Sequence, residues 1–345
     1  MRFGLFGAAQ AQRGGGPDVD SATGFNDFIE YLIEAEALGY ESAFVVEHHF
    51  TGFGQVSATL NLLGWVGAKT STLRLGTAVI VLPWHNPVLL AEQAATLDLL
   101  SGGRLDFGVG KGYRHNEFAG FGIPMEDAAA RFEESIDIIT KSWTSNERFS
   151  FRGRFWQFED IVVEPPTRQK PHPPFWQGAG HPESIHKVAA RGHNLLLDQF
   201  ASIEETINRF SIYKTAIQTQ GFGFSPSQVG VARAFLVVDT AEEKTAAVER
   251  RLKAQRQMQA ISQRPDGRNT ASIMAFSDTR EASEESALYG TPDEICRKLE
   301  RLQAAGVEYV LLNGGGTSRR NLQRFAWEVM PHFRSGESGK AAAAE

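Results

Sequence analysis

Three ionisable residues stand in a row where an apolar stretch of the chain gives way to a loop. The segment FVVEHHFTGFG begins as a buried strand, and Glu47, His48 and His49 directly follow its apolar residues. Because imidazole titrates near neutral pH, one of these histidines could act as a base or a hydrogen-bond donor. The alternative is a structural role, with the imidazoles bonded to backbone or to Glu47. Metal ligation is disfavoured, because adjacent residues at a strand end point apart and no HxxxH or CxxC pattern supplies further ligands.

Two glycine-bearing stretches further along the chain suggest a second kind of chemistry. In GVGKGYRHNEF, three glycines at alternate positions let the backbone approach a ligand closely, and Lys111 and Arg114 add positive charge. A flexible turn with solvated charges is the simpler alternative. A bound phosphate group would account for the glycines and the cations together.

The second of these stretches is QGAGHPESI. Its glycine-bearing turn leads into an expected helix with Pro182 and Glu183 in the first turn. Exposed N–H groups at a helix N-terminus bind phosphate, and Ser184 could add a hydroxyl group. Glu183 could instead only complement the helix dipole. Each stretch is a weak signal alone, but the two together favour a phosphate-bearing ligand.

The rest of the sequence predicts the framework that holds these residues. Continuous apolar runs alternate with segments of helical periodicity, as a parallel sheet with crossover helices requires. Eight such units predict a closed (β/α)8 TIM barrel. A doubly wound open sheet is less favoured, because the turn after the first strand lacks a clean GxGxxG fingerprint. The expected strands are 2–6, 43–47, 73–82, 104–109, 174–178, 194–198, 229–238 and 307–313.

Two interruptions of this rhythm predict insertions in a single domain that spans residues 1–334. A hairpin insertion is expected at about 145–172, where RFSFRGRFWQFED turns on a glycine and leads into a proline-rich connection. The polar, irregular stretch 261–289 is a candidate mobile lid. The small-residue tail 335–345 is expected to be frayed.

Composition narrows the class of protein. The net charge of −6 and the absence of a basic block disfavour a nucleic-acid partner. The single cysteine, Cys296, rules out a disulfide framework within the chain. The N-terminus lacks a long apolar segment and no run approaches the length of a membrane span, so we expect a cytoplasmic protein without membrane contact.

Polar and aromatic residues gather at the predicted carboxyl ends of the strands, which is where barrels carry their active sites. Trp84 and Phe50 suggest an apolar or aromatic substrate, whereas Arg114 could meet an anionic group. The expected substrate-pocket residues are Trp84, His85, Arg114, Phe50 and Gln199.

Several of these motifs resemble a known family. VVEHHFTGFG, LRLGTAVIVLP, LSGGRLDFGVGKGYRHNEFAGFG and GTPDEICRKLERLQAAGV follow one another as in the bacterial luciferase-like family of flavin-dependent monooxygenases. The resemblance spans nearly the whole chain and is strongest over residues 1–125, which look like the luciferase alpha subunit. It implies a (β/α)8 barrel with an insertion, binding reduced FMN or the deazaflavin F420 at the strand ends.

The resemblance also assigns roles to single residues. His48 matches the active-site histidine near the flavin C4a position, and Glu47 is expected to tune its basicity. The Ala78–Val79 bond matches a cis peptide beside the isoalloxazine ring, and Lys111 matches a position that often carries an arginine on the FMN phosphate. Because luciferases carry a reactive cysteine where this chain has Gly110, light emission is not implied. The remaining implied cofactor-binding residues are Gly110, Tyr113, Gly180, His181 and Ser184.

The function that the resemblance implies is a two-component monooxygenase. Reduced FMN would arrive from a separate NAD(P)H:flavin reductase, react with O2 through a C4a-(hydro)peroxyflavin, and oxygenate a small organic substrate. One alternative is an F420-dependent oxidoreductase that transfers hydride on the same barrel. Another is a non-catalytic flavin-binding homologue. The family usually dimerises through the region of helices 57–69 and 88–100, so a homodimer is expected.

Overall fold

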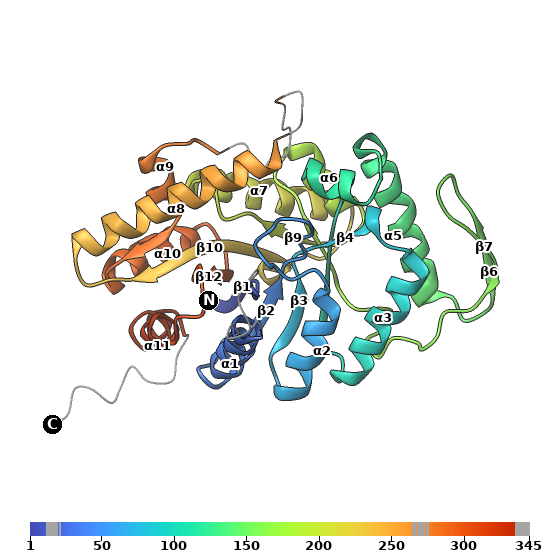
Figure 1. The fold of residues 1–345 in the computed structure, drawn as a ribbon, viewed down its shortest axis with the longest axis horizontal. Helices are drawn as coiled ribbons and strands as arrows, with labels where there is room; N and C mark the ends of the chain where they lie inside the picture. The colour runs from blue at the N-terminus through green and yellow to red at the C-terminus, as the bar shows by residue number, and fades with distance from the viewer. Residues whose placement is uncertain (12–19, 21, 264–266, 268–272, 274–275, 335–345) are drawn as a thin grey trace.

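Eight parallel strands close into a barrel in the computed structural model, as the sequence predicts (Figure 1). The structure describes residues 1–11, 20, 22–263, 267, 273 and 276–334. The strands pair in the order β10, β12, β1, β2, β3, β5, β8 and β9, and pairing between β9 and β10 closes the ring. Their bounds are β1 (Arg2–Gly7), β2 (Ser42–Val45), β3 (Arg74–Thr77), β5 (Leu105–Gly110), β8 (Phe175–Gly178), β9 (Asn194–Leu197), β10 (Val229–Val237) and β12 (Tyr309–Asn313).

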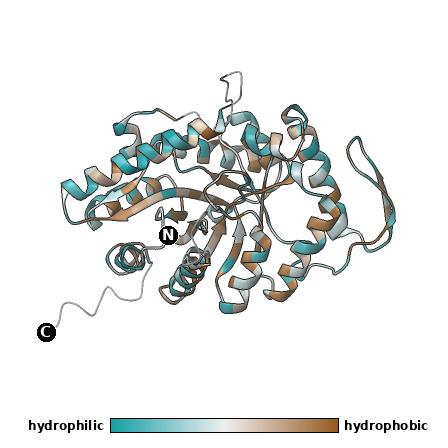
Figure 2. Ribbon diagram, viewed as in Figure 1, coloured by the Kyte–Doolittle hydropathy of each residue, from teal (hydrophilic) through white to brown (hydrophobic). Residues whose placement is uncertain are grey.

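Helices surround the barrel and bury their apolar faces against it, while their hydrophilic faces point outward (Figure 2). Local signals fix several helix starts: the Asn86 side chain accepts hydrogen bonds from the first turn of α3, and Thr291 and Glu294 form a capping box at α10. The helices are α1 (Thr23–Ala37), α2 (Thr59–Lys69), α3 (Pro87–Leu100), α4 (His115–Gly120), α5 (Ala128–Thr144), α6 (Pro182–Ala190), α7 (Ile203–Thr219), α8 (Ala241–Ser262), α9 (Arg280–Glu285), α10 (Pro292–Ala304) and α11 (Arg319–Glu328). In the described part of the chain, no helix is both long enough and apolar enough to cross a membrane.

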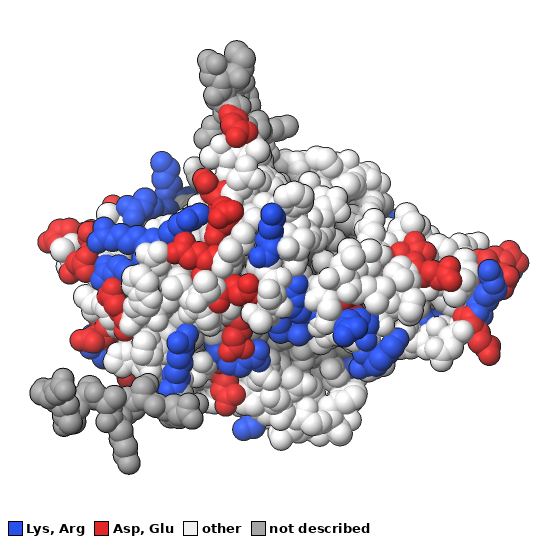
Figure 3. Space-filling view, turned by 90° about the horizontal axis from the view of Figure 1, so that it is seen from below, with Lys and Arg blue, Asp and Glu red and all other residues white. Residues whose placement is uncertain are grey.

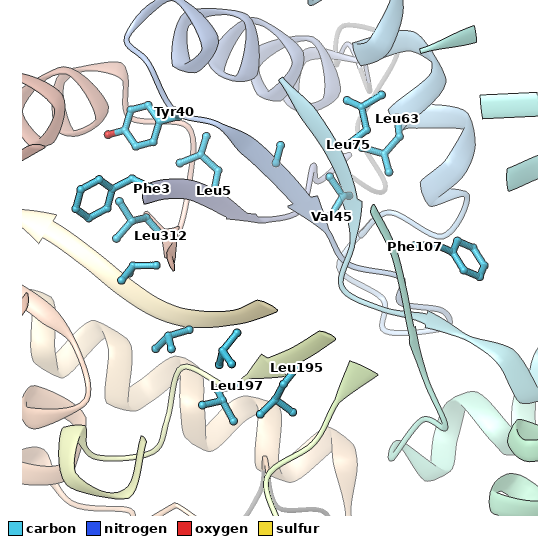
Figure 4. Close-up of a cluster of buried hydrophobic side chains, with 14 of the residues drawn as sticks. Phe3, Leu5, Tyr40, Val45, Leu63, Leu75, Phe107, Leu195, Leu197 and Leu312 are labelled. Carbon is cyan, nitrogen blue, oxygen red and sulfur yellow. The ribbon is translucent and has the colours of Figure 1, made fainter. Parts of the chain in front are cut away.

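The hydrophobic core has two parts, one on each face of the barrel wall. The larger part lies between strands and helices, where side chains such as Val45, Leu75 and Leu195 pack outward (Figure 4). The smaller part fills the barrel interior and consists of Phe44, Trp176, Leu196, Tyr309 and Leu311. Aromatic rings fit there because small residues face them: a β-carbon at Gly76 would collide with the ring of Phe44. Phe6, Ala78 and Val79 pack on this interior cluster and also line the cavity above it.

The structure divides one of the expected strands and contains the expected hairpin. The predicted strand 73–82 is divided into β3 and the short β4 (Ile80–Val81), and the intervening Ala78–Val79 peptide is cis, as the resemblance implied. The hairpin within 145–172 is present as β6 (Phe149–Arg152) paired with β7 (Gln157–Ile161), and it projects from the barrel in Figure 1.

The stretch 261–289, expected to be an irregular lid, is partly regular. Helix α9 lies within it, and β11 (Leu288–Gly290), which begins at its end, extends the sheet by pairing parallel with β10. The sequence of α9 is polar because little of this helix is buried. It therefore lacks the apolar periodicity from which a helix could be predicted. Most of 264–275 and all of the tail 335–345 lie outside the described residues.

Candidate active site

A cavity of about 390 Å³ opens at the carboxyl ends of the barrel strands. That is where barrel enzymes bind their ligands, and the volume lies in the range of small-molecule sites. Most of the residues expected from the sequence contribute to its wall. Those residues are Glu47, His48, Ala78, Val79, Gly110, Lys111, Tyr113, Gly180, His181, Ser184 and Gln199.

His48, just beyond β2, is held by an acid that the sequence analysis did not single out. Its Nδ1 lies 3.1 Å from Oε1 of Glu117, a buried residue of α4, and the same oxygen accepts the His49 N–H at 2.9 Å. A carboxylate acceptor selects the tautomer with the proton on Nδ1, so Nε2 is an acceptor when the ring is neutral. Burial lowers the pKa of His48, and the nearby Arg114 charge lowers it further; the Glu117 hydrogen bond opposes both. His48 is therefore neutral at pH 7.

Glu47 organises the wall next to His48. It is 2% exposed, and its Oε1 accepts hydrogen bonds from Nε2 of His49 at 2.8 Å and from Nε2 of His85 at 2.6 Å. Its Oε2 accepts the Val81 N–H at 2.7 Å. Burial opposes ionisation of Glu47, but these hydrogen bonds and the charge of His85 together lower its pKa. Glu47 thus ties β2 to the segment after the cis peptide, and its hydrogen bonds go to the other two histidines rather than to His48.

Lys111 and the start of α6 make the cationic side of the cavity. Lys111 is exposed, Ser184 lies in the first turn of the nine-residue α6, and both line the cavity. His181 is the N-cap residue of α6, and its side chain makes no capping hydrogen bond. It therefore does not occupy the first-turn N–H groups of this helix. Such a helix start next to a lysine suits an anionic group. Glu183, the acid of this turn, forms an exposed ion pair of 3.0 Å with Lys187.

Two glycines of the cavity wall allow neighbouring side chains to pack closely against the backbone. A β-carbon at Gly110 would lie 2.5 Å from the Val79 side chain, and one at Gly112 would lie 2.8 Å from both Phe118 and Val81. Gly112 also has a φ of +77°, a conformation that favours glycine. The glycines of GVGKGYRHNEF are therefore required by the packing of the cavity wall.

Three of the expected substrate-pocket residues line neither this cavity nor the second one beside it. Trp84 packs against His49 and Phe121, with ring centroids 5.4 Å and 5.3 Å away. Phe50 is 59% exposed at the protein surface. His85 hydrogen-bonds Glu47 behind the wall. Their positions next to strand ends in the sequence suggested the pocket, but Trp84 and Phe50 instead pack with His49 and Phe121 in an aromatic cluster.

Arg114 and Gln199 lie at a second cavity of about 280 Å³ that adjoins the first. His48, Tyr113 and Gln199 line both cavities, so the two meet beside the imidazole. The second cavity lies at the ends of β1 and β12, where Gln10 and Asn313 also contribute to its lining.

Glu117 is the main site residue that the sequence analysis missed. Its signal was present in GYRHNEF, because Glu117 follows Arg114 at the i, i+3 spacing that brings side chains together on a helix. A six-residue helix is too short for hydrophobic periodicity to reveal it. Among the described residues, no group of three or more His, Cys, Asp or Glu side chains could hold a metal ion.

The family model described as luciferase-like monooxygenase matches residues 1–309. The chain belongs to the luciferase-like monooxygenase family. It is 26% identical over 325 residues, 90% of either chain, to the oxygenase component of flavin-dependent trigonelline monooxygenase from Acinetobacter baylyi. It is 27% identical over 327 residues, 90% of its length and 88% of the relative's, to FMNH2-dependent dimethylsulfone monooxygenase from Pseudomonas putida. These family members are flavin-dependent monooxygenases by name.

Two solved structures share the barrel fold of this chain. Monooxygenase RslO1 from Streptomyces bottropensis superposes with a TM-score of 0.82 at 25% identity, covering 97% of this chain and 100% of that one. An F420-dependent secondary alcohol dehydrogenase superposes with a TM-score of 0.77 at 18% identity, covering 96% and 99%. The second likeness concerns the fold alone, and it shows that an F420-dependent enzyme shares this architecture.

The residues of the first cavity fit a flavin mononucleotide. Ala78, Val79 and Gly110 line a cavity of about 390 Å³, which is large enough for a small-molecule ligand. The cavity is lined by mainly apolar residues around the cis peptide, whereas Lys111 and the α6 turn supply the positive charge that a phosphate needs.

Proposed function

We propose that this chain is the oxygenase of a two-component, FMN-dependent monooxygenase. It would take reduced FMN from a separate NAD(P)H:flavin reductase and use O2 to oxygenate a small organic substrate. Reduced FMN, when bound, supplies the reaction with oxygen, and the protein supplies binding, orientation and exclusion of water.

The observation that carries this proposal is the pairing of His48 with Glu117 at the wall of a cavity that also contains Lys111 and the α6 turn. Lys111, Ser184 and the α6 N–H groups would hold the phosphate, and Ala78, Val79 and Gly110 would bound the ring. Neutral His48, fixed by Glu117, would present Nε2 to the reacting groups as a base or hydrogen-bond acceptor. Glu47 would keep the wall in place. The FMN-dependent relatives support the choice of cofactor.

Anaerobic titration with reduced FMN and, separately, with reduced F420 tests the proposal. We expect reduced FMN to bind and then to be oxidised by admitted oxygen at a rate that differs from that of free FMN. Lys111→Gln should weaken FMN binding, whereas Lys253→Gln, at an exposed position on α8, should not. Binding of F420 without binding of FMN would instead establish the hydride-transfer alternative. The phosphate-binding residues alone do not separate these cofactors, since both carry a ribityl phosphate.

We also propose that the chain forms a homodimer through α2 and α3. Trp65, Leu89, Leu99 and Leu100 expose large apolar side chains on these helices, with Trp65 59% and Leu100 80% exposed. Contiguous exposed apolar surface is typical of an interface. Figure 3 views the molecule from below, the side on which α2 and α3 lie in Figure 1, and areas without charged side chains lie between the charged groups on this face.

A further inference from the structure

The second cavity contains a buried cation whose hydrogen-bonding groups are incompletely used. Arg114 is 3% exposed, and its Nε and Nη1 have no hydrogen-bond partner among the described residues. Leaving buried donors unsatisfied is unfavourable, and more so for a charged group, so a ligand that supplies acceptors would be favoured here.

The nearest acid balances the charge of Arg114 without satisfying its N–H groups. Oε1 of Glu117 lies 3.9 Å from Arg114 Nη1, which is beyond hydrogen-bond distance. That same oxygen already accepts from His48 Nδ1 and from the His49 N–H. The guanidinium also lies 5.6 Å from the centroid of the Tyr113 ring. Arg114 is thus held in position by its surroundings, while its Nε and Nη1 lack partners among the described residues.

The lining of the second cavity favours an anion with an apolar body. Among the described lining residues, Arg114 is the only Arg, Lys, Asp or Glu, and the Glu117 carboxylate that pairs with it does not line this cavity. Neutral amides of Gln10, Gln55, Gln199 and Asn313 add hydrogen-bonding capacity. Apolar residues make up much of the rest of the wall, among them Phe6, Phe28, Phe44, Phe200 and Leu312.

From these contacts we infer that the substrate is a small carboxylate whose anionic group binds Arg114 in the second cavity. A carboxylate oxygen can accept a charge-assisted hydrogen bond from the guanidinium. The volume of about 280 Å³ limits the ligand to a small molecule. Since His48, Tyr113 and Gln199 line both cavities, a ligand anchored at Arg114 occupies space that adjoins the proposed flavin site. The inference rests on the proposed function for the reaction, but the carboxylate site itself does not.

Calorimetric binding of benzoate and benzamide tests this assignment, because the two differ in charge while sharing their shape. We expect benzoate to bind at least about tenfold more tightly than benzamide, the preference of one charge-assisted interaction. Arg114→Gln should abolish the preference for benzoate over benzamide. Arg114→Lys, which keeps the positive charge, should retain part of that preference. Arg320→Gln, which removes an exposed guanidinium on α11, should leave it unchanged.

A second readout follows from the position of Arg114. Its charge lowers the pKa of His48, so bound benzoate should raise that pKa in an NMR titration of the imidazole. Equal binding of benzoate and benzamide to the wild-type chain would overturn the inference, and this comparison does not depend on how any variant folds. Tighter binding of benzenesulfonate than of benzoate would overturn the choice of a carboxylate.

The two proposals fail separately in these experiments. Binding of reduced FMN without a preference for benzoate would remove the carboxylate site and leave the proposed function standing. Preference for benzoate without binding of FMN would leave the carboxylate site and remove the proposed function.

Discussion

Nδ1 of His48 lies 3.1 Å from Oε1 of Glu117, and these two residues come from different elements, the end of β2 and the helix α4. The contact fixes the imidazole ring and its tautomer, and it presents Nε2 as the acceptor nitrogen. Arg114 and the His49 N–H also lie next to the same Glu117 oxygen, so changes at these groups affect the His48 imidazole.

Replacement of His48 by alanine should separate catalysis from cofactor binding. The imidazole is proposed to act on the reacting groups, and general acid–base catalysis contributes about 10²–10⁴ in rate. We expect the rate of oxygenation to fall by about that factor while the Kd for reduced FMN stays within a few-fold of wild type. Rapid-mixing kinetics and anaerobic binding titrations measure the two quantities, and an equal loss in both would contradict the assigned role.

Glu117→Gln and Arg114→Gln should shift the pKa of His48 in opposite directions. The Glu117 carboxylate stabilises imidazolium, so its neutralisation should lower the pKa of His48 further below the ordinary value. The Arg114 charge destabilises imidazolium, so its removal should raise that pKa. NMR titration of the His48 ring gives both values. Shifts of the same sign in the two variants would show that the folded geometry around His48 differs from the one described.

Glu47→Gln should destabilise the fold more than it alters cofactor affinity. The buried carboxylate accepts three hydrogen bonds, whereas an amide offers a single acceptor oxygen and adds two donors to the same site. We expect the free energy of unfolding to fall by about 1–3 kcal/mol in urea denaturation. Glu159→Gln, at a side chain that is 84% exposed, is the matched control and should change it by less than about 0.5 kcal/mol. Wild-type stability of Glu47→Gln would refute the structural role.

His193 should make the fold sensitive to acid. Burial, with smaller contributions from the charges of Arg191 and His172, lowers the pKa of His193 from 6.5 to about 3. Below pH 6.5 the unfolded chain therefore binds a proton at His193 that the folded chain excludes. The free energy of unfolding decreases as the pH is lowered. This contribution is at most about 1.4 kcal/mol per pH unit between pH 6 and 4.

His193→Phe should flatten this part of the stability profile. The ring stacks on Phe175 with centroids 4.6 Å apart, so phenylalanine retains the aromatic contact while losing the titration and the Gln177 hydrogen bond. Urea denaturation at several pH values measures the slope. His332→Phe, at an exposed position after α11, is the control. Parallel profiles for wild type and His193→Phe would show that His193 titrates normally in the folded state.

Leu100→Glu should weaken the proposed dimer. A carboxylate placed in an apolar interface must lose its hydration, and the expected rise in the dimer Kd is about tenfold or more. Sedimentation velocity over a range of concentrations measures it. Trp327→Glu introduces the same charge at a side chain that is 64% exposed on α11, away from α2 and α3, and should leave association unchanged. A monomeric wild-type chain at all concentrations would contradict the dimer.

The sequence by itself determined the barrel and the edge at which its site lies. Continuous apolar runs such as LRLGTAVIVLP are only stable when buried on both faces, and their number and spacing leave a closed parallel barrel as the favoured solution. Side chains that follow such strands must then meet at one edge. The glycines around Lys111 and the turn before α6 could also be recognised, because their backbone requirements are local.

Tertiary structure alone decided which of those side chains act together. Neighbours in sequence separated: His48 bonds Glu117, while the adjacent Glu47 bonds His49 and His85. Arg114 and Trp84 both follow strand ends, yet one is buried beside a cavity and the other packs in a surface cluster. Such contacts join residues tens of positions apart, and they depend on the direction in which each side chain leaves the backbone once the elements have packed. Local residue patterns carry no information on that direction, so only the folded chain determines it.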